Sequence, residues 1–277
     1  MQQKSISLWL REAAQQLKET GIESSRLDAE IILAHTLKKP RTYLHAHSDQ
    51  MLNPRDREIA DARLDLRLDF TPIAYIIGHK EFYGRKFKVT TATLVPRPET
   101  ETMIDMVKES FDSTRPLITQ TTQLVDVGTG SGCIGITLKR ELPELDVTLV
   151  DISQHALSVA KQNAVAHATD VQIHHGDLLR EYGLPIDIIC ANLPYVDPVW
   201  EVSRDTHAEP RIALYARDNG LSLIKVLLLQ AAQLLRPHGQ LFLEADPRQH
   251  EAIVRHAKQQ SFRHRETRGY IVSLTRM

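Results

Sequence analysis

The feature that most constrains this chain is a glycine-rich turn between a short apolar segment and a helix-forming one. Residues 126–132 read Asp-Val-Gly-Thr-Gly-Ser-Gly. They overlap the end of the β-prone run 123–127 and precede a helix expected over 134–141. Alternate glycines let the backbone adopt positive φ and approach a ligand closely. A strand, such a turn and a helix in this order are typical of nucleotide-binding α/β folds.

Strand and helix patterns alternate through the rest of the chain. Further strands are expected at 147–150, 171–175, 186–191, 240–245 and 270–274, with helices at 156–166 and 221–235. This alternation predicts an α/β fold built on a doubly wound, mostly parallel, Rossmann-like sheet. Ligands of such a sheet bind beyond the carboxyl ends of its strands.

The first 70 residues show helical spacing and no strand pattern. A capping box at Ser25–Asp28 is expected to open one helix, and Asn53-Pro54 to open another. Residues 81–89 alternate around Gly84 as a β-hairpin would. We therefore expect a small all-helical recognition domain over 1–70, a hairpin linker over 71–95 and a catalytic domain over 96–277.

Composition excludes several classes of protein. The 277 residues are 42% hydrophobic, which is enough for a core, and the net charge of −1 disfavours non-specific nucleic-acid binding. The two cysteines, Cys133 and Cys190, cannot make a disulfide framework or a four-cysteine zinc site. With no signal peptide and no apolar run of about 18 residues, we expect a cytoplasmic enzyme that holds no metal.

An acidic residue ends the second strand of the α/β region. Asp151 stands 19 residues after Gly132, where a carboxylate can accept both hydroxyls of a ribose. An adenosine-containing cofactor is therefore expected against the turn formed by Gly128, Thr129, Gly130, Ser131 and Gly132. Residues 130–135 also match the dinucleotide-binding pattern G-x-G-x-x-G, so NAD stays open as the cofactor. The position of Asp126 ahead of the glycines favours S-adenosylmethionine over NAD.

A second motif follows the strand expected at 186–191. Asn192-Leu193-Pro194-Tyr195 should face the same cleft as the glycine turn. The side chain of Asn192 and the carbonyl of Leu193 can accept the two hydrogens of an NH2 group. Pro194 restricts Leu193 to extended geometry, and Tyr195 offers a flat face to a planar substrate. The motif therefore favours S-adenosylmethionine and methyl transfer to an NH2 group.

These motifs resemble the HemK-type protein-(glutamine-N5) methyltransferases, which modify class I peptide chain release factors. The resemblance covers nearly the whole chain and includes Pro96–Glu101, Asp126–Gly132 and Asn192–Tyr195, with further matches at 72–78, 81–82, 151–157, 176–177, 209–214, Gly239 and Glu244. It implies a class I methyltransferase fold, S-adenosyl-L-methionine as cofactor and methylation of the glutamine of a Gly-Gly-Gln motif. A release factor would be the protein partner.

The same resemblance implies roles for individual residues. Asn192, Leu193, Pro194 and Tyr195 would bind the glutamine and serve catalysis, while Asp177, Leu178 and Asn192 would join the glycine turn and Asp151 around the cofactor. The family pattern is Asn-Pro-Pro-Tyr, so Leu193 is a departure. Any residue supplies the carbonyl, but the freer backbone costs on the order of 1 kcal/mol of preorganisation.

Two other functions stay open at this point. An adenine-N6 nucleic-acid methyltransferase shares the Asn-Pro-Pro-Tyr pattern but needs a basic target-recognition region, which the charge balance does not support. A non-catalytic cofactor-binding module would tolerate Leu193, although the intact Asn192, Pro194 and Tyr195 argue against it.

Overall fold

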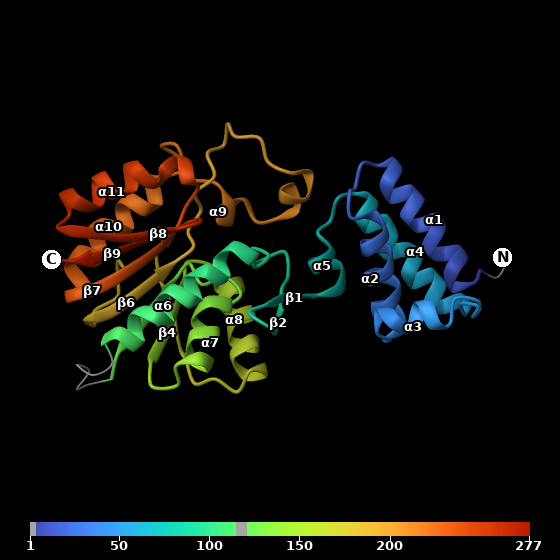
Figure 1. Ribbon diagram of the computed structural model, residues 1–277, viewed down its shortest axis with the longest axis horizontal. Helices are drawn as coiled ribbons and strands as arrows, with labels where there is room; N and C mark the ends of the chain where they lie inside the picture. The colour runs from blue at the N-terminus through green and yellow to red at the C-terminus, as the bar shows by residue number, and fades with distance from the viewer. Residues whose placement is uncertain (1–3, 115–120) are drawn as a thin grey trace. The chain divides into compact units, whose positions relative to one another are not determined.

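The computed structural model describes residues 4–114 and 121–277, which form two compact units (Figure 1). The first unit comprises the chain through Gly78 together with Ser203–Ala208. The second comprises His79–Val202 and the chain from Glu209 onward. Within the described ranges, no helix is long and apolar enough to cross a membrane.

The first unit is helical, as its sequence predicts. It contains α1 (Ile6–Glu19), α2 (Ser25–Leu37), α3 (Arg41–Ala46), α4 (Pro54–Leu68) and α5 (Ile73–Ile77). Its core is formed by buried apolar side chains that include Trp9, Leu17, Ile32, Leu33 and Leu64. The short helices α3 and α5 were not expected, because segments of five or six residues hold too few apolar positions to show a helical period.

The two predicted helix starts in this unit have different outcomes. The Asn53 side chain accepts the backbone N–H of Asp56 at 2.8 Å and caps α4, as predicted. The capping box at Ser25–Asp28 is wrong, because Ser24 is the N-cap residue and makes no side-chain bond to the backbone. Asp28 instead accepts from Ser24 Oγ at 2.8 Å and from Arg67 Nε at 2.7 Å.

The second unit is built on a seven-stranded sheet with the strand order β5-β4-β3-β6-β7-β9-β8. The first five strands in this order pair in parallel, and β9 pairs antiparallel to both β7 and β8. The mostly parallel sheet is therefore confirmed. The strands are β3 (Gln123–Val127), β4 (Asp146–Asp151), β5 (Gln172–His175), β6 (Ile186–Ala191), β7 (Leu235–Glu244), β8 (Phe262–Arg268) and β9 (Ile271–Arg276).

Helices cover both faces of this sheet (Figure 1). On one face, α6 (Glu101–Thr114), α7 (Cys133–Glu141) and α8 (Gln154–Ala166) bury side chains such as Leu124 and Leu149. On the other, α10 (Ser222–Leu234) and α11 (His250–Gln259) pack against residues such as Val125 and Leu241. Successive residues of one strand therefore enter different cores, as a doubly wound sheet requires.

The predicted hairpin is present in the second unit. Strands β1 (His79–Phe82) and β2 (Arg85–Lys88) pair antiparallel across Tyr83 and Gly84, which both have positive φ. The Lys88 N–H donates to Asn163 Oδ1 of α8 at 2.8 Å. By its contacts the hairpin belongs to the second unit.

Strand order reverses between β3 and β6, which lie side by side with Val127 paired to Ala191. The loops after these strands therefore diverge at the carboxyl edge of the sheet and leave a crevice there. The glycine turn follows β3, and Asn192–Tyr195 follows β6. The fold thus brings the two predicted motifs to one place.

A largely buried ion-pair cluster joins three segments of the first unit. Arg67 donates from Nε to Asp28 at 2.7 Å and from Nη2 to Asp205 at 2.9 Å. The Arg67 and Asp28 side chains are each 5% exposed. Removal of one partner would leave a buried charge without its counter-ion, which is the costly way to break such a pair.

We expect Arg67→Met to lower the free energy of unfolding of the first unit by about 3–5 kcal/mol. Arg26→Met is the matched control, because the Arg26 side chain is 82% exposed and its pair with Glu30 should contribute less than about 1 kcal/mol. Urea unfolding followed by Trp9 fluorescence in a Trp200→Phe background reports on this unit. Equal stability of the two variants would contradict the prediction.

Candidate active site

A cavity of about 230 Å³ lies at the carboxyl ends of the central strands. The two predicted motifs and Asp151 meet on it, and Asp177 and Leu178, which follow β5, complete one side. Its other walls come from Ala92–Leu94, Pro96, Thr100, Ile212, Ala213 and Leu223. Among the predicted residues of the site, Gly132 and Tyr195 do not line it.

Hydrogen bonds from beneath fix the glycine turn. Asp126 Oδ2 accepts from Thr129 Oγ1 at 2.6 Å and from the N–H of Gly135 at 2.9 Å. Gly130 donates its N–H to Asp151 Oδ2 at 2.9 Å, which ties the turn to the end of β4. Gly132 is the N-cap of α7 at φ +81°, so its contribution is to the shape of the turn.

Two carboxylates at this turn are held in low-polarity surroundings. Burial raises the pKa of Asp126 to about 6, although hydrogen bonds from Thr129 and Gly135 act to lower it. Burial also raises the pKa of Asp151, against hydrogen bonds from the backbone N–H groups of Ser153 and Gly130. Each oxygen of Asp151 keeps acceptor capacity after these bonds, so the side chain can still accept hydroxyl groups from the cavity.

The Asn192–Tyr195 segment combines a cavity-lining part with a buried part. Asn192, Leu193 and Pro194 line the cavity, but the leucine is only 3% exposed. Its Cδ2 lies 2.9 Å from the point that a Cβ on Gly128 would occupy. Leu193 therefore packs against the glycine turn, and its side chain belongs to the core as well as to the site.

Sequence reasoning assigned no role to Thr100 or Glu244, which contact the motif directly. Thr100 Oγ1 donates to Glu244 Oε2 at 2.6 Å and accepts from Asn192 Nδ2 at 3.2 Å. The Tyr195 hydroxyl donates to Glu244 Oε1 at 3.2 Å. Burial raises the pKa of Glu244 to about 7 and also raises that of Tyr195. Both missed residues fall within matches to the family pattern, the one signal that could have singled them out.

A third residue without an assigned role, Glu209, fastens two walls of the cavity to each other. Its side chain, 2% exposed, accepts the N–H of Val95 at 3.0 Å and pairs with Arg97. The segment after Val95 contributes Pro96 to the cavity, and the segment after Glu209 contributes Ile212 and Ala213. This buried carboxylate thus sets the position of the walls.

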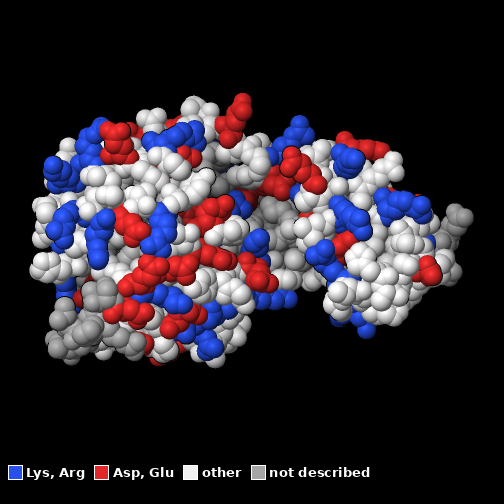
Figure 2. Space-filling view, in the orientation of Figure 1, with Lys and Arg blue, Asp and Glu red and all other residues white. Residues whose placement is uncertain are grey.

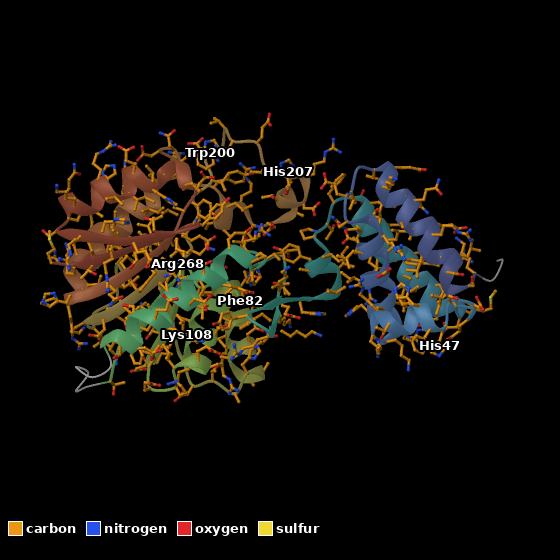
Figure 3. The ribbon with its side chains drawn as sticks, in the orientation of Figure 1. His47, Phe82, Lys108, Trp200, His207 and Arg268 are labelled. Atoms are coloured by element: carbon orange, nitrogen blue, oxygen red, sulfur yellow. The ribbon has the colours of Figure 1, made fainter. Side chains whose placement is uncertain are left out.

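An aromatic residue marks the loop that follows the motif. Trp200 lies in this loop (Figure 3), with the guanidinium carbon of Arg248 3.7 Å from its ring centroid. A cation–π contact of this kind contributes about 0.5–1 kcal/mol at an exposed site. On the visible face of the second unit, acidic and basic side chains occur together (Figure 2).

Two family models match different parts of the chain. The PrmC N-terminal domain matches residues 9–78, and the methyltransferase small domain matches residues 104–208. A release factor glutamine methyltransferase of Koribacter versatilis is 38% identical over 247 residues, which are 85% of this chain and 86% of that protein.

Other relatives extend beyond this chain. A bifunctional methyltransferase of Rickettsia felis is 36% identical over 280 residues, covering 91% of this chain but 53% of that protein. The chain thus spans about half the length of the bifunctional relatives it matches. Among solved structures, a methyltransferase from Pyrococcus furiosus superimposes with a TM-score of 0.51 at 14% identity, covering 78% of this chain and 95% of that one. This likeness concerns the fold alone.

Gly220 packs closely against the backbone of the Asn192–Tyr195 motif. A Cβ on Gly220 would lie 1.9 Å from the carbonyl oxygen of Tyr195, whereas one on Gly269 would meet nothing within 4 Å. Both glycines have positive φ, so alanine at either costs about 1–2 kcal/mol of backbone strain.

We expect Gly220→Ala to lower the Tm clearly more than Gly269→Ala, because only the former also displaces Tyr195, at roughly 1–3 kcal/mol of further cost. Differential scanning calorimetry of the two full-length variants measures the difference. Equal Tm values would show that the Tyr195 backbone moves freely.

Proposed function

The chain belongs to the family of release factor glutamine methyltransferases, and we propose that it transfers a methyl group from S-adenosyl-L-methionine to the side-chain amide N5 of a glutamine. The substrate would be the Gly-Gly-Gln motif of a class I peptide chain release factor. The observation that carries this proposal is the placement of Asn192 on the same cavity as the glycine turn and Asp151.

The residues around the cavity fit the cofactor. Gly128, Thr129, Gly130 and Ser131 supply a close backbone approach, and Asp151 supplies acceptors for ribose hydroxyls. Asp177 and Leu178 would border the adenine, and Asn192 would lie beside the transferred group. When bound, S-adenosyl-L-methionine supplies an electrophilic methyl group on a positively charged sulfur. Two carboxylates at the glycine turn, Asp126 and Asp151, give surroundings suited to that charge.

The protein's part in the reaction is to hold a poor nucleophile. The lone pair of an amide nitrogen is delocalised into its carbonyl. Acceptance of both N–H hydrogens by Asn192 Oδ1 and the Leu193 carbonyl would orient the nitrogen and stabilise the positive charge that develops on it. Pro194 keeps Leu193 extended, and the buried Leu193 side chain restrains the same peptide. No general base is assigned, because the methylated nitrogen is acidic enough to lose its proton to water.

We further propose that the helical first unit recognises the release factor. Its match to the PrmC N-terminal domain, separate from the match of residues 104–208 to the methyltransferase small domain, supports a role other than chemistry. The buried, unpaired thiols of Cys133 and Cys190 agree with a cytoplasmic setting for such an enzyme. The net charge of −1 gives no support to direct binding of nucleic acid.

The test is mass spectrometry of a class I release factor after incubation with the full chain and S-adenosyl-L-methionine. We expect the mass of one methyl group to appear on the glutamine of Gly-Gly-Gln, and Asn192→Ala to lower kcat/KM at least 100-fold, about 2.7 kcal/mol of transition-state stabilisation.

Leu193→Pro should change the rate by less than about tenfold, because the acceptor is a backbone carbonyl. It should cost roughly 1–2 kcal/mol of stability, because Leu193 packs in the core.

Several outcomes would contradict this assignment. Methylation of adenine in nucleic acid, with none on release factor, would support the adenine-N6 alternative. Cofactor binding without turnover would support the binding module. Full activity of a folded Asn192→Ala variant would remove Asn192 from the glutamine site.

The role of Asp151 is tested by binding alone. Asp151→Ala should weaken S-adenosyl-L-methionine binding by about 1.5–3 kcal/mol, the range for charge-assisted hydrogen bonds. Asp146→Ala, at the opposite end of β4, should leave the Kd unchanged. Isothermal titration calorimetry gives both values, and an unchanged Kd in a folded Asp151→Ala protein would exclude the ribose contact.

A further inference from the structure

A chain of hydrogen bonds runs from the motif into the core of the second unit. It links Asn192 after β6, Thr100 in η1 (Pro98–Thr100) and Glu244 at the end of β7. Glu244 is 1% exposed and Thr100 is 2% exposed. The Tyr195 hydroxyl occupies the other oxygen of the same carboxylate. The Asn192 side chain also forms a hydrogen bond with Glu244 itself. Only Asn192 and Thr100 reach the cavity.

The direction of this chain is set by its inner end. An ionised carboxylate only accepts hydrogen bonds, so the single hydroxyl hydrogen of Thr100 must point at Glu244. Thr100 Oγ1 then has only lone pairs to offer to Asn192. The NH2 side of the Asn192 amide therefore faces Thr100, which leaves its Oδ1 as the atom available to a substrate.

We propose that Glu244 is a positioning residue that, both directly and through Thr100, holds the Asn192 amide with its oxygen turned toward the substrate's NH2 group. This role rests on the proposed glutamine-holding function of Asn192. A flipped Asn192 would present hydrogens to the NH2 group and repel it. Glu244 itself does not line the cavity, so it acts on the orientation of Asn192 and not on the reacting atoms.

Protonation of Glu244 should release this constraint. A neutral carboxyl group can donate to Thr100, whose hydroxyl can then turn its hydrogen toward Asn192 and admit the flipped amide. Burial, reinforced by Glu99, raises the pKa of Glu244 to about 7. The active arrangement belongs to the ionised form, so kcat should rise with pH through this pKa and fall on the acid side.

Other titratable groups surround Glu244 and must be separated from it. Glu99 stands on η1, Cys133 on α7 and Tyr195 after β6, with Arg97 and Tyr270 acting on Tyr195. His250 Nε2 lies 3.1 Å from the carbonyl oxygen of Ala245, the next residue along from Glu244. His250→Gln removes this imidazole and is the control for it.

The first measurement is kinetic and uses full-length protein with release factor. Glu244→Gln keeps the shape of the side chain but removes its charge, and Thr100→Val removes the hydroxyl. We expect each to lower kcat about 10- to 100-fold, with the cofactor Kd unchanged, because only the alignment of the amide is lost. Thr100→Ser should restore most of the rate. The acid limb of the kcat profile should vanish in Glu244→Gln and persist in His250→Gln.

The second measurement needs no substrate. The side-chain NH2 signals of Asn192, identified by their loss in Asn192→Ala, should shift with pH in a ¹H–¹⁵N spectrum of the wild type. They should not shift over the same range in Glu244→Gln, and they should shift less in Thr100→Val than in the wild type. The proposal would be overturned if the chemical shifts of the Asn192 NH2 group did not change with pH in the wild type. An unchanged kcat in a folded Glu244→Gln protein would also overturn it. If wild type titrates as expected yet methylates no release factor, the proposed function fails and the positioning of Asn192 stands.

Discussion

Parallel pairing of β3 with β6 is the constraint on which the site depends. The strand order reverses at this pair, so the two following loops turn away from each other and open a cavity between them. One loop brings glycines and the other brings Asn192. Residues from 92 to 223 contribute to this cavity, and they can converge there only because the sheet aligns the carboxyl ends of its parallel strands.

Buried carboxylates organise the walls of the cavity. Asp126 binds the glycine turn, Glu209 joins two wall segments, and Glu244 binds Thr100 and Tyr195. Of these, Asp126 and Glu244 accept hydrogen bonds from neutral donors, and burial raises the pKa of both. Such groups cost stability when ionised, and the function proposed for this site, which is to accommodate a cation and orient an amide, gives them a use.

Leu193 shows how stability and function share one residue here. Proline at this position would rigidify the backbone through its ring, whereas leucine restrains the same peptide through packing against Gly128. The Leu193 carbonyl, which we propose accepts a hydrogen bond from the substrate, can therefore be held in place by core contacts. This packing also couples the loop sterically to the glycine turn, because any side chain substituted at Gly128 would collide with Leu193.

The sequence by itself determined the features that depend on neighbours along the chain. The glycine turn, the hairpin at Tyr83-Gly84, the Asn53 cap and the alternation that predicts a mostly parallel sheet all follow from local backbone preference and side-chain period. The tertiary structure alone decided contacts between distant residues. Asp28 accepts a hydrogen bond from Arg67, 39 positions away, and does not form the predicted capping box. Glu244 accepts a hydrogen bond from Thr100, 144 positions away. A carboxylate or hydroxyl carries no local signal of its partner, because the partner is chosen by packing after the strands have aligned.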